Sequence, residues 1–597
     1  MNHRPLIVAA IVVSLAGAIG CSDETADSVT KLTSEQLTDP QACKDCHPKH
    51  YREWSGSMHA YAADDPVFIA MNKRGQRETK GELGDFCIKC HAPMAVKLGA
   101  TTDGLNVDEL PRHLKGVTCI YCHSVTNIKD DHNAAIDISV DAILRGGLAK
   151  PLATGAHKME YSALHDGGHL DSSKMCGTCH DIVTPRGLHI ERTFKEWRDS
   201  LFSSEQLGKS SSCSSCHMHT DFGKAANVSG AEIRKVHAHD FPGVDLAVTE
   251  FPERATQRKH VQEDLDPTVL AQLCVEVTAT TQTRVEVFLQ NVSAGHSFPS
   301  GASADRRLWV ELIASKGDKT IWSSGVVKDD EAVADKGPSV WLLRDTLRDK
   351  KYKEVHMFWE AEKTDSQLLP APPKDTKTGP EAAETRKYRT YVLPSKPDSL
   401  KMRLRLRPIG LDVLNSLVKS GDLDPKHVKS HPTFDLAGGA LNWTAAGAKE
   451  KTTPTGRKAL CVPKLLVEGA DDPLAGADPY TPGMSLKTKN GQVTVRLEKS
   501  DPAPPAEGKN TWTVKLHDPN GKALDGLSIE AGTWMPDHHH GSPIIGKSKA
   551  LGGGRYEISP IELFMPGLWE ITLGVSGKAT SGIAIDDKVV FRFWVAE

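Results

Sequence analysis

The sequence predicts a multidomain protein with a mainly α-helical and irregular N-terminal region followed by β-sandwich domains. Three observations carry this prediction. The motif Cys-x-x-Cys-His occurs five times between residues 43 and 217, apolar and polar residues alternate between residues 265 and 407, and strand patterns return in residues 483–597. A chain of 597 residues also exceeds what one hydrophobic core supports, so several domains are expected.

The overall composition excludes few classes of function. The chain is 39% hydrophobic and 25% charged, and its formal net charge is −4. It lacks the strongly basic balance that is typical of nucleic-acid-binding domains, so we expect no nucleic-acid partner.

The first 20 residues predict a signal for export. Arg4 precedes an apolar run from Leu6 to Ala18, which is short for a membrane span. The run ends in Ala18-Ile-Gly-Cys21, which resembles a bacterial lipobox, so Cys21 is expected to carry a lipid. By the same resemblance, Ser22 in the next position indicates an outer-membrane lipoprotein, at the periplasmic face or the cell surface. A plain signal peptide is the alternative. Residues 21–40 are polar and predict a flexible tether.

The five motifs predict covalent attachment of five c-type haems. In such a motif the two thiols bind the two vinyl groups of one haem, and the adjacent imidazole ligates its iron. Structural zinc or disulfides would not require a His after every pair, so we disfavour them. The haem-attaching thiols are Cys43, Cys46, Cys87, Cys90, Cys119, Cys122, Cys176, Cys179, Cys213 and Cys216, and the proximal ligands are His47, His91, His123, His180 and His217.

Residues 41–250 should therefore form a haem-packed domain of short helices and long loops, because the haems supply its apolar interior. One helix is expected at Ile190–Phe202.

The sixth ligand of each iron decides its chemistry. A second His leaves an electron relay, whereas an open position lets a substrate bind. Candidate distal ligands lie between the motifs or after them, with His237 as the alternative to His239: His59, His157, His165, His239 and His296. Five candidates for five irons favour relays.

Strand patterns dominate the rest of the chain. Residues 265–480 predict a β-sandwich with a helical insertion, in which Leu411, Leu414 and Leu417 have helical spacing before Gly421. Residues 483–597 predict an immunoglobulin-like sandwich. Cys274 and Cys461 remain after the motifs and Cys21 are assigned, so we expect them to form a disulfide; two buried free thiols are the alternative.

Several segments resemble multihaem cytochromes of the c-554/c-prime group and related octahaem enzymes. They are Cys43-Lys-Asp-Cys-His47 with Ser57-Met-His59, Gly116-Val-Thr-Cys-Ile-Tyr-Cys-His123, Cys176-Gly-Thr-Cys-His-Asp181 and Gly295-His-Ser-Phe-Pro-Ser-Gly301. The resemblance implies that the loop of His296 reaches back from the β region to a haem. Relatives that are enzymes often replace one proximal His by Lys or carry more haems, and neither feature occurs here.

The C-terminal segment with Met535-Pro-Asp-His-His-His540 resembles the YtkA-like β-sandwich. His538–His540 and nearby Met side chains could bind copper, because imidazole and thioether ligands suit it. An exposed His-rich loop with a structural Met-Pro turn is the interpretation that we favour over copper binding.

The sequence thus favours an exported electron-transfer protein, with redox proteins or a periplasmic or extracellular acceptor as partners and membrane attachment through lipid. Homo-oligomers or filaments are conceivable. The first alternative is an oxidoreductase acting on a small nitrogen or sulfur oxyanion at one five-coordinate haem. The second is a copper-handling or adhesion module in which the haems are auxiliary.

Overall fold

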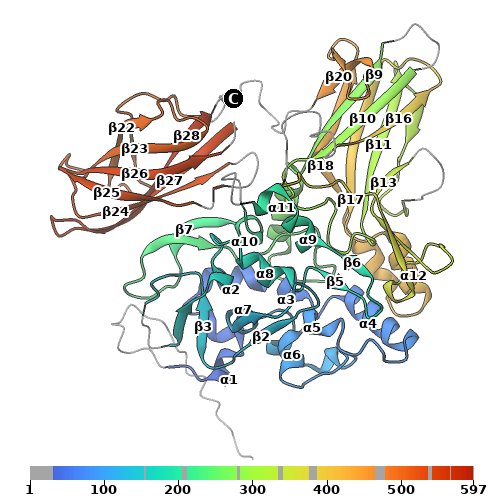
Figure 1. The fold of residues 1–597 in the computed structure, drawn as a ribbon, viewed down its shortest axis with the longest axis horizontal. Helices are drawn as coiled ribbons and strands as arrows, with labels where there is room; N and C mark the ends of the chain where they lie inside the picture. The colour runs from blue at the N-terminus through green and yellow to red at the C-terminus, as the bar shows by residue number, and fades with distance from the viewer. Residues whose placement is uncertain are drawn as a thin grey trace, which may run out of the picture.

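The computed structural model describes residues 31–152, 156–204, 211–277, 283–333, 340–374, 386–463, 477–535, 541–542, 544–564 and 567–595. It shows a multidomain chain with a helical N-terminal region and two β regions (Figure 1). Within these ranges no helix is both long enough and apolar enough to cross a bilayer. Cys21 and His538–His540 lie outside the described residues, so the lipidation and copper predictions stay predictions.

The N-terminal region consists of short helices joined by loops and two-stranded sheets. Its α-helices are α1 Ser34–Leu37, α2 Pro48–Ser55, α3 Met58–Tyr61, α4 Pro66–Glu78, α5 Ile88–His91, α6 Pro93–Lys97, α7 Cys119–His123, α8 Ser172–Gly177, α9 Thr193–Arg198, α10 Cys213–His217 and α11 Arg254–Leu265. Its strands pair as β1 Val125–Ile128 with β2 Ile136–Ile138, β3 Ile143–Gly146 with β4 Lys158–Tyr161, β5 Ile182–Val183 with β6 His189–Glu191, and β7 Thr220–Lys224 with β8 Ile233–His237.

Local sequence explains where several of these helices begin. Helix α4 starts with Pro66, and the Asp65 carboxylate accepts a hydrogen bond from the Val67 amide at 3.0 Å. Helix α1 has a capping box in which Thr33 and Gln36 bond each other's backbone amides, and Leu37 is buried. The predicted tether at residues 21–40 is therefore folded from Thr33 onward.

The helix expected at residues 190–202 is shorter in the structure, where only α9 forms. Residues 189–191 instead pair with β5, which commits their backbone to a sheet. At the other end the Ser200 hydroxyl donates to the Trp197 carbonyl and accepts from the Phe202 amide, and this ends the helix.

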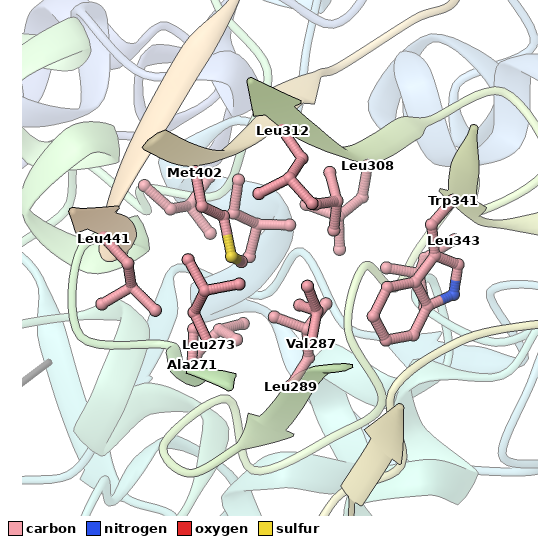
Figure 2. Close-up of a cluster of buried hydrophobic side chains, with 14 of the residues drawn as sticks. Ala271, Leu273, Val287, Leu289, Leu308, Leu312, Trp341, Leu343, Met402 and Leu441 are labelled. Atoms are coloured by element: carbon pink, nitrogen blue, oxygen red, sulfur yellow. The ribbon is translucent and has the colours of Figure 1, made fainter. Parts of the chain in front are cut away.

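The middle region contains two antiparallel sheets that share one hydrophobic core. Their strand orders are β16-β10-β9-β20-β19 and β12-β11-β17-β18, with β13 also paired to β11. Figure 2 shows Leu273 and Val287 of one sheet facing Leu308 and Met402 of the other. The strands are β9 Val269–Glu276, β10 Thr283–Asn291, β11 Arg307–Lys316, β12 Lys319–Ser324, β13 Trp341–Leu343, β14 Asp345–Arg348, β15 Lys363–Ser366, β16 Arg386–Leu393, β17 Ser399–Arg407, β18 Phe434–Thr444, β19 Lys449–Thr452 and β20 Lys458–Pro463.

Two sequence predictions for this region are confirmed. Helix α12 spans Leu411–Lys419, and Gly421 follows with φ of +83°, a conformation that glycine adopts readily. A disulfide joins Cys274 of β9 to Cys461 of β20, which are direct neighbours in the sheet.

The C-terminal region is one eight-stranded antiparallel sheet around its own core, with the order β21-β22-β23-β26-β25-β24-β27-β28. Its two ends meet, because the Lys489 amide after β21 donates to the Lys588 carbonyl in β28 at 2.7 Å. The strands are β21 Ser485–Lys487, β22 Thr494–Asp501, β23 Gly508–His517, β24 Ser528–Trp534, β25 Gly546–Gly552, β26 Arg555–Leu563, β27 Gly567–Lys578 and β28 Ala584–Val595.

The β7–β8 hairpin of the N-terminal region packs against the sheet of the C-terminal region (Figure 1). The ring of Phe222 lies against Gly532 and Gly574, where any Cβ would collide with it. The Lys588 ammonium bonds the Asp221 carboxylate at 2.6 Å beside this contact. The C-terminal region is thereby held against the part of the chain that carries the Cys-x-x-Cys-His motifs.

Candidate functional site

The N-terminal region encloses a cavity of about 1510 Å³, and side chains from both β regions close parts of its wall. A pocket for one small molecule usually has about 300–1,000 Å³, so this cavity suits something larger. All five motif histidines and all five candidate distal histidines line it. The sequence thus directs its candidate ligands to one interior space.

The motifs meet in pairs inside the cavity. The thiol of Cys43 contacts that of Cys119, Cys90 contacts Cys179, and Cys176 contacts Cys213. The first motif therefore adjoins the third, and the fourth adjoins both the second and the fifth. Groups attached to these thiols would lie next to each other although their motifs are up to 89 residues apart.

Four proximal imidazoles are oriented by the backbone. Each has its Nδ1 atom within hydrogen-bond distance of a carbonyl oxygen, which can only accept, so Nδ1 carries the proton and Nε2 is left for a metal. The pairs are His47 with Ala225 at 2.8 Å, His91 with Ala62 at 2.9 Å, His123 with Arg145 at 2.6 Å and His217 with Pro242 at 2.7 Å.

The spacing between imidazoles tests whether a haem iron fits. A histidine nitrogen binds a transition metal at about 2.0 Å and lies roughly 1.1 Å from its ring centre, so two imidazoles on opposite sides of one metal have centroids about 6.2 Å apart. Four proximal histidines have a distal candidate at this spacing: His47 with His157 at 6.3 Å, His180 with His59 at 6.3 Å, His123 with His239 at 6.4 Å, and His217 with His296 at 6.3 Å.

The distal members of these pairs also offer the appropriate nitrogen. His239 Nδ1 lies 3.0 Å from the His237 carbonyl and His296 Nδ1 lies 2.8 Å from the Ser297 carbonyl, so Nε2 is available in both. Burial lowers the pKa of His59 to about 3 and the pKa values of His180 and His296 to about 4. These imidazoles are neutral at physiological pH, as metal ligation requires.

His165 occupies a different position from the other distal candidates. Its ring lies 5.7 Å from that of His123, closer than the spacing above, and its Nε2 lies 2.7 Å from the Cys122 carbonyl. Its Nδ1 is buried and has no hydrogen-bond partner within the described part of the chain. His239 matches the expected spacing opposite His123, whereas His165 lies beside the peptide of the third motif.

His91 differs from the other four proximal histidines. Within the described residues, no second histidine lies at the spacing of an opposing ligand, and the ring of Phe68 stacks on His91 at 3.9 Å. The cavity wall near this motif includes Met71, Phe86 and Phe358, and the last two are in ring contact at 5.5 Å. The described surroundings of His91 are therefore largely apolar.

The cavity also contains ionisable groups that sequence reasoning did not single out. Burial raises the pKa of the Glu191 carboxyl to about 7 and that of Asp305 to about 6, and both line the cavity. His50 lies 4.7 Å from His239 ring to ring. No motif marks these residues, because their positions depend on loops that fold back over the cavity.

The first motif differs in one respect from the other four. Its Cys46 is disulfide-bonded in this structure, whereas attachment of a haem there requires the free thiol of Cys46.

Comparisons with known proteins agree with this geometry. Residues 42–124 match the family model "Cytochrome c554 and c-prime", and residues 487–574 match the model "YtkA-like". The motifs and the N-terminal family match together support a multihaem c-type cytochrome with covalently bound haem and a redox or electron-transfer role. A comparison with curated proteins found no match.

One similar solved structure is a penta-heme cytochrome c552 from Thermochromatium tepidum. It is 20% identical, with a TM-score of 0.47, and the match covers 68% of this chain and 98% of that one. Two structures of FetP from uropathogenic Escherichia coli strain F11, one copper-bound, cover 20% of this chain at 10% identity, with TM-scores of 0.14 and 0.15, and 97% and 98% of their own chains.

Proposed function

We propose that this protein is an exported pentahaem cytochrome that relays electrons, and that four of its haems have histidine on both sides of the iron. The four imidazole pairs at 6.3–6.4 Å carry this proposal. The chain would hold the irons with proximal His47, His123, His180 and His217 and distal His157, His239, His59 and His296. Haem supplies a reversible one-electron couple, and two imidazole ligands leave no position for a substrate.

The contacts between thiols support a branched path for the electron. They connect the first motif to the third and the fourth to the fifth. Cys122 of the third motif lies within electrostatic reach of Cys179 of the fourth, which completes the order one, three, four, five. The second motif branches from the fourth through Cys90 and Cys179.

The middle region, which we interpret as a β-sandwich, holds one ligand in place. The loop of His296 is fixed to α9, because the Glu196 carboxylate accepts from the Ser297 amide at 3.2 Å and from the Ser300 hydroxyl at 2.7 Å. A hydrogen bond of 2.7 Å between the Thr193 and Ser300 hydroxyls also connects α9 to this loop. A ligand from the β region thus completes a site whose proximal residue is His217.

The remaining parts of the proposal concern location and partners. A signal at residues 1–20 and a lipid on Cys21 would place the protein at the outer membrane, facing the periplasm or the cell surface. Its partners would be redox proteins or an external electron acceptor. Copper binding by His538–His540, and assembly into oligomers or filaments, are further parts of this hypothesis.

Intact mass spectrometry and optical reduction of the purified, exported protein test the proposal. We expect the mass of five haems on the chain and complete reduction of all five by a small electron donor. Fewer than five covalently held haems would contradict it.

A second candidate function follows from His91. A haem held there has no histidine opposite it among the described residues, so its iron could bind a substrate such as a nitrogen or sulfur oxyanion. Of the wall residues Phe68, Met71, Phe86 and Phe358, only Met71 carries an atom that ligates iron. Carbon monoxide binding to the reduced protein separates the two functions: one molecule per chain supports a reaction site at His91, and none supports a relay alone.

A further inference from the structure

Glu191 is a carboxylate in the wall of the cavity. It ends strand β6, and the register of β5 and β6 places it opposite Ile182, two residues after His180. The residue is half-buried, and its side chain lines the cavity. Across the described residues, its carboxyl group makes neither a hydrogen bond nor an ion pair. A buried charge without a partner is costly, so this group is expected to change protonation easily.

Arg306 is the cation that favours the ionised form of Glu191, but it is not paired with Glu191. Arg306 is committed elsewhere: it donates to both oxygens of Asp245 at 3.0 Å, to the Pro408 carbonyl at 3.0 Å and to the Ser300 carbonyl at 3.0 Å. The other charges that act on Glu191 are the carboxylates of Asp305, Asp245 and Asp181, which all disfavour its ionised form. Glu191 therefore faces one shared cation and three anions.

Glu191 also lies within electrostatic reach of the second motif, because its negative charge raises the pKa of the Cys90 thiol. Cys90 contacts Cys179 of the fourth motif, so Glu191 lies near the place where the second and fourth haems would adjoin. With a pKa of about 7, its proton occupancy responds to a nearby change of one charge at physiological pH.

We propose that Glu191 is a proton-binding site coupled to the redox state of the haem at the second motif. When that iron goes from the ferric to the ferrous state by accepting one electron from a redox partner, Glu191 takes one proton from water and an O–H bond forms at its carboxylate. Reoxidation returns the proton to water and the electron to the acceptor. The inference rests on the proposed haem binding at the second and fourth motifs. Each reduction of the haem at His91 would then be accompanied by uptake of one proton, and each reoxidation by its release.

Potentiometric titration of the holoprotein between about pH 6 and pH 8 tests the inference. One proton per electron changes the equilibrium tenfold per pH unit, so the midpoint potential of one haem should fall by up to about 59 mV per pH unit. We expect Glu191→Gln to abolish this slope for that haem and Glu191→Asp to retain it. Glu311→Gln should retain it as well, because Glu311 is buried but ion-paired with Arg403 and Arg405.

Redox-difference infrared spectroscopy gives a second readout. Reduction of the wild-type protein should produce a band of a protonated carboxylic acid that is missing in Glu191→Gln. An unchanged slope together with an unchanged band in Glu191→Gln would overturn the inference. Intact mass separates this failure from failure of the proposed function, since a Glu191→Gln protein with five haems leaves only the proton site in question, whereas a wild-type protein with fewer haems removes the haem proposal.

Discussion

The N-terminal region and the C-terminal region differ in what fills their interiors. The C-terminal sheet surrounds a continuous cluster of side chains that includes Trp512, Trp569 and Phe591, each fully buried. The N-terminal region has a smaller apolar cluster that includes Ile88, but it also surrounds a cavity of about 1510 Å³ whose wall carries the motif cysteines and histidines. One region can stabilise itself by burying its own apolar surface, whereas the other presents ligands and depends on what they bind.

The difference also explains the two kinds of secondary structure. Alternating apolar residues give long strands when a sheet packs on side chains, as in β27 and β28. Around the cavity the longest helix is α4, and several motif helices have only four or five residues. Short helices of this kind are marginal alone, so their order depends on contacts made through the cavity.

The largest expected effect is the loss of structure in haem-free protein. If haem attachment is prevented, we expect residues 41–250 to lose protection from hydrogen exchange while residues 485–595 keep it, because only the second region has a complete core. Hydrogen exchange followed by mass spectrometry measures both regions in one sample. Equal protection of the two regions with and without haem would contradict the comparison.

Removing one distal ligand should change one iron and leave the fold intact. We expect His239→Ala to convert one low-spin haem to a high-spin haem, because His239 has the spacing of an opposing ligand to His123. His165→Ala is the matched control and should leave all spin states unchanged, since its Nε2 is bonded to the Cys122 carbonyl. Magnetic circular dichroism distinguishes the two variants, and the reverse pattern would assign the ligand to His165.

A cavity made in the β core should cost stability without changing the haems. Leu404 in β17 is fully buried between the two sheets of the middle region, so Leu404→Ala should lower the free energy of unfolding by about 2–5 kcal/mol. Calorimetry gives the change, and the visible spectrum should be unaltered. Leu551→Ala, at an exposed position, should change stability by no more than about 0.5 kcal/mol.

The smallest expected effect concerns an ion pair between the N-terminal and middle regions. Arg77 of α4 donates to both Asp422 oxygens, at 2.6 and 2.7 Å, and lowers the pKa of that carboxyl. Because the folded pKa is below the unfolded one, the pair stabilises the fold above the unfolded pKa of about 3.9 and this contribution is lost as pH falls through the folded value.

Arg77 is half exposed, so Asp422→Asn should cost at most about 1 kcal/mol at pH 7, and less in high salt. Thermal unfolding of both proteins at pH 7 and at low pH measures the effect. A difference that grows as the solution is acidified would show that the pair does not act in this way.

Much of the β architecture could be predicted from the sequence, and the Cys-x-x-Cys-His motifs can be read from it directly. Period-two alternation marks β9, β10, β11 and β17, and the two cysteines left outside the motifs form the disulfide. The helix expected in residues 190–202 is much shorter, because strand pairing with β5 competes for the same backbone. The local sequence pattern of residues 190–202 does not show that part of this segment pairs with another strand.

The set of candidate ligands could be predicted, but their partners could not. His59 lies 12 residues after His47, yet its ring faces His180, and His296 reaches the fifth motif from another region. Only the fold brings these residues together. The same limit applies to Glu191, because its lack of an ion pair depends on which carbonyls and carboxylates occupy Arg306.

Electron paramagnetic resonance of the fully oxidised protein tests the central claim most directly. The four imidazole pairs predict four low-spin ferric haems per chain, and the surroundings of His91 predict a fifth that is high-spin. Integrated intensities in the ratio of four to one would agree with this account. Two or more high-spin haems per chain, or five low-spin haems of the same type, would contradict it.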